Sequence, residues 1–177
     1  MKPLLPVVLL AAAAISCGFS TAAVAHASLE TQSAAVDSHY KGVMKIGHGC
    51  KGSPTQTVRI LLPLEIRKAK PMPKAGWTLE TVKKTLDEPF DYYGKTVTED
   101  VREIIWSGGN LSDDFFDEFV FSAKLAGEPG QTLYVNTIQE CPDGENRWTE
   151  IPEEGQDSHD LKSPAPVLQL TEKHHNH

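Results

Sequence analysis

Apolar and polar positions alternate in short runs along this chain, and glycine, proline or asparagine separates the runs. Such period-two alternation is typical of half-buried β-strands. It predicts strands over residues 43–46, 57–62, 77–82, 101–106, 118–123, 132–138, 147–151 and 166–170. Apolar residues at helical spacing are missing beyond a turn or two near 112–115. The pattern therefore predicts an all-β fold, an antiparallel immunoglobulin-like β-sandwich.

Two segments refine this picture. Within residues 118–123 the alternation puts Phe119 and Phe121 on one face and Glu118 on the other. The proline-rich segment 68–76 is predicted to be an ordered loop between strands, because strand patterns continue on both sides of it. We therefore expect a single domain without an interdomain linker.

The beginning of the chain has the pattern of a secretory signal peptide. One lysine precedes a long apolar run and then a stretch of small residues. Ala23 and Ala25 place the cut directly before His26, so residues 1–25 form the predicted signal peptide. A cut after Ala27 also fits the small-residue rule and would discard the histidine. The apolar run is too short for a membrane-spanning helix, so we expect an exported protein, for example in the periplasm.

Cleavage before His26 would create a chelating group. The new α-amine and the imidazole of one histidine can bind the same metal ion, and nitrogen donors in a tetragonal arrangement suit Cu(II). One carboxylate would complete the coordination, and the candidates are Glu30 and Glu118. Met44 and Met72 are the two methionines left after cleavage, so a Cu(I) site built on thioethers is not expected.

Two cysteines, Cys50 and Cys141, remain after cleavage, because Cys17 lies in the leader. In an exported domain such a pair is expected to form a disulfide. The bridge would close a loop of about 90 residues, which contributes roughly 4–5 kcal/mol by loop entropy. A metal site at the cysteines, with His48 as a neighbour, is the alternative.

Charge and motifs exclude several classes of function. Without the leader the chain has 16 basic and 24 acidic residues, a net charge of −8, which argues against nucleic acid and anionic lipid as partners. The sequence contains no Gly-x-Ser-x-Gly elbow, phosphate-binding glycine loop or His-Glu-x-x-His motif. No apolar stretch of membrane length follows the leader. We therefore expect neither an enzyme nor a membrane span in the mature chain.

The other histidines carry weaker signals. His39 and His159 are predicted to be surface residues, and His48, between two glycines, could be structural or could support a metal from a distance. Residues 171–177 are predicted to form a flexible tail whose histidines can hold a metal loosely: His174, His175 and His177.

Several sequence blocks, in one order along the chain, carry a family resemblance. They are residues 48–55, 69–77, 106–111, 117–119, 139–141 and 147–152. Together they resemble the YcnI-like family of exported bacterial copper-binding domains, and the predicted domain covers residues 26–170. The resemblance implies a β-sandwich in which the N-terminal histidine holds Cu(II) through amine and imidazole, a glutamate supplies oxygen and a tryptophan lies beside the metal. These roles fall to His26, Glu118 and Trp148.

The resemblance implies a function as well. It predicts a periplasmic protein that buffers Cu(II) or hands it on, with exported copper chaperones or membrane copper transporters as partners. It also favours the cut before His26. One alternative is a copper-dependent oxidative enzyme of the monooxygenase type, in which His39 or His48 supplies a second imidazole. Another is a metal-free structural or assembly domain in which His26 has no role.

Overall fold

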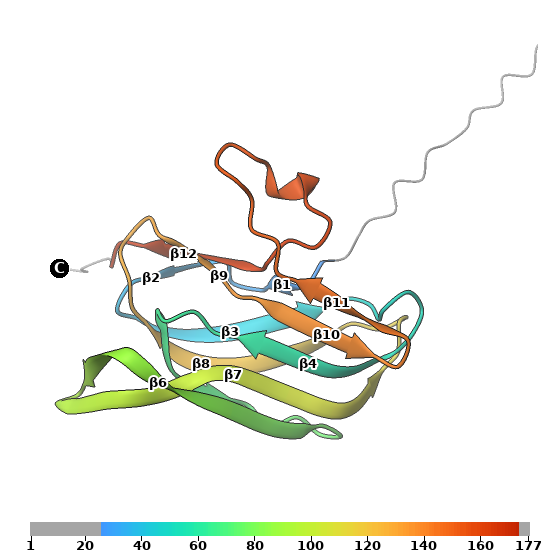
Figure 1. Ribbon diagram of the computed structural model, residues 1–177, viewed down its shortest axis with the longest axis horizontal. Coiled ribbons are helices and arrows are strands. Elements are labelled where there is room, and N and C mark those ends of the chain that lie inside the picture. The colour runs from blue at the N-terminus through green and yellow to red at the C-terminus, as the bar shows by residue number, and fades with distance from the viewer. Residues whose placement is uncertain (1–25, 174–177) are drawn as a thin grey trace, which may run out of the picture.

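The computed structural model describes residues 26–173 (Figure 1). The predicted signal peptide, residues 1–25, and the tail histidines lie outside the described residues. Within the described part the elements are β1 (Ser28–Leu29), β2 (Ser33–Ala35), β3 (His39–Ile46), β4 (Thr55–Leu61), β5 (Ile66–Pro71), β6 (Thr78–Tyr92), β7 (Lys95–Leu111), β8 (Asp117–Leu125), β9 (Thr132–Tyr134), β10 (Thr137–Cys141), β11 (Gly144–Trp148), the single-turn 3₁₀-helix η1 (Ser158–Asp160) and β12 (Val167–Thr171).

Two large sheets pack face to face. One has the strand order β1-β3-β8-β5, the other the order β11-β10-β4-β7-β6, and neighbouring strands in both are antiparallel. A third sheet of order β2-β12-β9 lies at one end, as Figure 1 shows, and its β2–β12 pair is parallel. The predicted all-β sandwich is therefore confirmed, and the parallel pair, formed by strands near the two ends of the chain, is an exception to its antiparallel order.

Alternation along the strands fills the space between the two large sheets. Phe119 and Phe121 of β8 are 0% and 1% exposed, as the sequence predicts. Ile60 of β4 and Trp106 of β7 belong to the same buried cluster, although they come from the opposite sheet. Burying side chains of this size removes apolar surface from water, and this burial stabilises the fold.

The segment 132–138 was predicted as one strand and forms two. β9 pairs with β12 in the third sheet, whereas β10 pairs with β4 in the five-stranded sheet. The change occurs at Val135 and Asn136, whose backbone groups bond in different directions: Val135 donates to Pro166, and Asn136 accepts from Leu61. A strand that moves from one sheet to another must break its ladder, and the sequence pattern carries no sign of the break.

The predicted loop 68–76 begins inside a strand. β5 pairs with β8 at the edge of its sheet, with an irregular register around Lys68, whose φ is 53°. Charged residues at three of its positions hide the strand pattern, and such charges are common on edge strands because they discourage pairing with other chains.

A buried ion pair ties β5 to β7. Asp100 and Arg102 have side chains that are 3% and 8% exposed and lie 2.9 Å apart. Arg102 also donates to the carbonyls of Pro63 and Ile66, while Asp100 accepts from the backbone of Lys68. These bonds give both charges partners inside the protein, which a buried charge requires.

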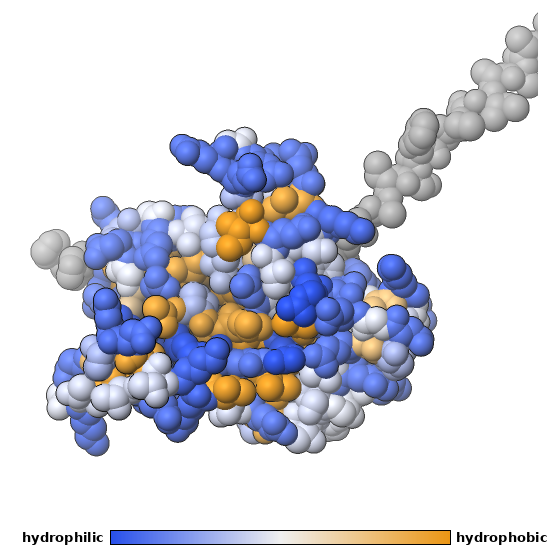
Figure 2. All heavy atoms as spheres, viewed as in Figure 1, coloured by the Kyte–Doolittle hydropathy of each residue, from blue (hydrophilic) through white to orange (hydrophobic). Residues whose placement is uncertain are grey.

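The face of the molecule seen in Figure 2 is mainly polar. Figure 2 shows charged and polar side chains over most of one face, with apolar groups gathered mainly near its centre. None of the helices among the described residues has the length and apolar character needed to cross a membrane.

Candidate metal centre

His26 lies beside the indole of Trp148. The two rings are 5.6 Å apart, centroid to centroid, and meet edge-on at 73°. His26 directly precedes Ala27, and Ala27 and Leu29 are 4% and 2% exposed, so this part of the chain is fixed on the core. Since β1 and β11 are the edge strands of the two large sheets, the contact forms where these two edges meet.

Gln139 fixes the position of the indole. The Trp148 ring nitrogen donates to its side-chain oxygen at 3.2 Å, and Asn146 donates to the same oxygen at 3.2 Å. The Gln139 amide nitrogen donates to the His48 carbonyl and to the Thr55 hydroxyl. Gln139 is 1% exposed, so these bonds satisfy a polar group that has no access to water. Its role was not predicted, although it lies within one of the blocks that resemble the family.

His48 lies on the same indole as His26. Its ring centroid is 6.0 Å from that of Trp148, again edge-on at 73°. Its Nδ1 is within hydrogen-bond distance of the Gly49 carbonyl. The next residue, Cys50, is bonded to Cys141 in the predicted disulfide, with 6.0 Å between the two Cα atoms. The disulfide prediction is therefore confirmed, and both cysteines are occupied by the bridge.

Glu118 lies farther along the sheet. The register places it opposite Lys45 of β3, and Lys45 lies opposite Ser28 of β1. Two strand spacings, about 10 Å, therefore separate the backbones of Glu118 and Ser28. The structure thus brings His26 and Trp148 together, whereas β3 lies between His26 and Glu118.

Glu118 also has surroundings of its own. It lines a hollow of about 370 Å³ on the outer side of β8, together with Met72, Lys74, Phe116, Asp117 and Val120. The Lys74 ammonium lies 2.6 Å from Asp117 and donates to the Glu118 carbonyl. The other carboxylate candidate, Glu30, is exposed and lies 4.0 Å from the Lys45 ammonium.

The donors around the indole suit copper(II). The side chains of His26 and His48 supply imidazole nitrogens, and cleavage before His26 would add an amine. The cysteines are bridged, and Met44 is fully buried in the core. No group of three His, Cys, Asp or Glu side chains gathers anywhere within residues 26–173. The side-chain donors at the indole are thus two imidazoles, and nitrogen ligands are the kind that Cu(II) prefers.

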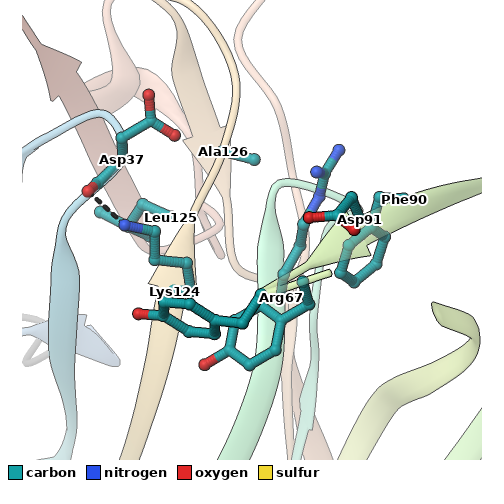
Figure 3. A pocket seen from close by; sticks show the side chains of 9 residues that line it. Asp37, Arg67, Phe90, Asp91, Lys124, Leu125 and Ala126 are labelled. Carbon is teal, nitrogen blue, oxygen red and sulfur yellow. Dashed lines mark hydrogen bonds between the residues drawn. The ribbon is translucent and has the colours of Figure 1, made fainter. Parts of the chain in front are cut away.

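A second cavity lies at the opposite end of the sandwich. It measures about 170 Å³ and is lined by the hairpin tip between β6 and β7 and by residues such as Asp37, Arg67 and Lys124 (Figure 3). Its cations already have partners: the Arg67 guanidinium lies 4.3 Å from the Phe90 ring centre, and Lys124 donates to the Asp37 carbonyl. This cavity therefore shows no obvious set of catalytic groups.

Comparison with known protein families shows to which family this chain belongs. The profile of the family described as "Domain of unknown function (DUF1775)" matches residues 26–170. The chain belongs to this family, the YcnI-like family. The matched region of this YcnI-like domain begins at His26 and contains Glu118, Trp148 and both bridged cysteines.

A solved structure supports the fold. The YcnI-like domain is similar to an uncharacterized protein from Nocardia farcinica, whose crystal structure reveals an immunoglobulin-like fold. The two chains are 18% identical with a TM-score of 0.63, and the similarity covers 82% of this chain and 98% of the other. No curated protein matches the chain. The likeness shows the fold alone, and it confirms the predicted immunoglobulin-like architecture.

Proposed function

We propose that this YcnI-like domain is an exported Cu(II)-binding protein that buffers copper or hands it on. The observation that carries the proposal is the contact between His26 and the buried indole of Trp148. His26 is the first residue of the family domain, and cleavage in front of it would turn its backbone nitrogen into an amine. The site is thus supported by position, by donor chemistry and by the sequence pattern of the leader.

Each residue has a definite task in this proposal. His26 binds through its amine and imidazole, which form a chelate that one side chain alone could not provide. Trp148 covers one side of the metal with an apolar ring that is held by Gln139. Glu118 is the proposed oxygen ligand on the strength of the family resemblance, and its charge would offset part of the charge of the ion. Bound Cu(II) supplies no catalytic step in this function.

The ligand types also limit the partners. Nitrogen and oxygen ligands favour Cu(II), whereas soft sulfur ligands favour Cu(I). Transfer to a Cu(I) carrier therefore requires a reductant or a partner that supplies sulfur ligands. Exported copper chaperones and membrane copper transporters are the proposed partners, and the proposed location is the periplasm.

The decisive test changes only the N-terminus. The protein is expressed with its own leader, and the exported product is sequenced to establish its first residue. Copper affinity is then measured by competition titration for this product and for the same product after selective acetylation of its α-amine. Acetylation turns the amine into an amide, which has no free electron pair for the metal and leaves no second amine in its place, so it should abolish tight binding.

A matched control is His39→Gln, because His39 is exposed and lies at the far end of β3. It should bind one Cu(II) as tightly as the unmodified protein. Equal affinity of the acetylated and the unmodified protein would contradict the proposal, and so would an exported protein that starts at Ser28.

A further inference from the structure

We infer that His48 supplies a second imidazole to the copper ion held by His26. This inference rests on the proposed function and adds a ligand that the family resemblance does not assign. It changes the expected site from one imidazole and an amine to two imidazoles and an amine. Four observations carry it: backbone position, a shared indole, a hydrogen-bond contact of the ring and the rigidity of the segment.

The first observation is the position of the backbone. β1 and β3 pair with Ser28 opposite Lys45 and Leu29 opposite Met44. His26 lies two residues before Ser28, and His48 lies three residues after Lys45. The two histidines therefore flank the same end of one antiparallel strand pair, although 22 positions separate them in the sequence.

The second observation is the shared partner. Both imidazoles contact the indole of Trp148, at 5.6 and 6.0 Å between centroids, and both meet it at 73°. Both imidazoles therefore pack against one and the same aromatic side chain, which lies beside the proposed metal.

The third observation is a hydrogen-bond contact of the His48 ring. Its Nδ1 lies within hydrogen-bond distance of the carbonyl oxygen of Gly49, and a carbonyl oxygen can only accept a hydrogen bond. This contact engages Nδ1 and leaves Nε2 as the ring nitrogen for a metal. Histidine ligands of metals commonly have this arrangement, in which one nitrogen donates to a carbonyl while the other binds the ion.

The fourth observation is that the segment around His48 is fixed from several directions. Cys50 is bridged to Cys141, the Gly49 amide donates to Asp113 at 2.7 Å, and the His48 carbonyl accepts from Gln139. Asn146 donates to the Gly49 carbonyl at 3.2 Å. A ligand on such a segment loses little conformational freedom when the metal binds, which favours tight binding.

The experiment counts imidazoles on bound Cu(II). Pulsed electron spin resonance detects the remote nitrogen of each coordinated imidazole, and combination lines reveal two equivalent rings. All samples are exported protein with the first residue confirmed, and all carry Gln at the tail histidines so that the tail cannot contribute. The variants are His48→Gln and the matched control His39→Gln, each loaded with one equivalent of Cu(II).

We expect two imidazoles in the parent protein and in His39→Gln, and one in His48→Gln. Copper affinity of His48→Gln should fall at least about tenfold, the lower end of the loss seen when even an outer partner of a metal ligand is removed. Added free imidazole should restore the two-imidazole signal in His48→Ala. A residue that only packs against Trp148 could lower affinity but would not change the number of imidazoles.

The outcomes separate the two proposals. One imidazole in the parent protein overturns the role of His48 and leaves the copper-binding function intact. No tight Cu(II) binding in the parent protein overturns the function and, with it, this inference. A count of one in the parent overturns the inference whether or not the His48 variants fold, and a count of two that persists in folded His48→Gln overturns it as well.

Discussion

Removing the Cys50–Cys141 bridge should cost this domain a large part of its stability. The bridge joins residues 91 positions apart, so it prevents the unfolded chain from opening over more than half of its length. The loop-entropy relation gives about 4.6 kcal/mol at 25 °C for a closed loop of about 90 residues. Domains of ordinary size have unfolding free energies of about 5–15 kcal/mol. The loss should therefore amount to a third or more of the total.

The assay is urea unfolding followed by tryptophan fluorescence. Three samples are compared: the oxidised protein, the same protein with reductant, and the double variant Cys50→Ser/Cys141→Ser. The reduced protein and the double variant should lose similar amounts, about 4–5 kcal/mol, because both free the same loop. The reduced protein is the cleaner sample, since Cys50 is 4% exposed and a serine there would add a buried hydroxyl.

A loss below about 1 kcal/mol in the reduced protein would refute the reasoning, because it would mean that the unfolded chain gains little freedom when the bridge opens. A large loss in the double variant with little loss on reduction would assign the effect to the buried hydroxyls instead.

Three other predictions follow from single residues. Asp100→Ala should cost about 3–5 kcal/mol in urea unfolding, because it leaves the Arg102 charge buried without its partner; a loss under about 1 kcal/mol would contradict this. Burial raises the pKa of Tyr40 from 10.0 to about 12. Stability should therefore fall by about 1.4 kcal/mol per pH unit within that window, as the unfolded state ionises first, and Tyr40→Phe should remove this part of the loss. Glu118→Gln should weaken Cu(II) binding and alter the spin-resonance spectrum of the bound copper without destabilising the fold. An unchanged affinity and spectrum would contradict the role of Glu118 and make Glu30 the candidate oxygen ligand.

The architecture could largely be predicted from the sequence because side-chain alternation has one physical cause, a sheet with one face on the core. Phe119 and Phe121 are buried as the pattern indicates. The pattern failed where another constraint acted on the strand. In β5 the exposed edge selects charged residues, and between β9 and β10 the chain changes sheets at Val135. In β5 the charges conceal the alternation, whereas the change of sheets leaves the alternation intact and so gives no sign of the break.

The candidate site was predictable only in part. The disulfide followed from the cysteine count in an exported chain, and the pairing of His26 with Trp148 was implied by the family resemblance. Gln139 was not assigned to the site, and His48 was considered only as a supporting group or, in the oxidative alternative, as a second imidazole, because their contacts depend on how the edges of two sheets meet. The bond between His48 and Gln139 spans 91 positions, and local periodicity carries no information about contacts over such distances.

The start of the folded chain gives the proposed site a dependence on processing. Ala27 and Leu29 are buried, so the backbone is fixed one residue after His26, beside the indole of Trp148. In the precursor the nitrogen of His26 is an amide, and the chelate cannot form without removing its proton. Cleavage before His26 makes this nitrogen an amine at a position that the fold has already fixed. Copper that binds there also stabilises the folded state, by about 2.7 kcal/mol when free copper is a hundred times its dissociation constant. Export, metal binding and the stability of β1 are thus coupled through one backbone nitrogen in the proposed function.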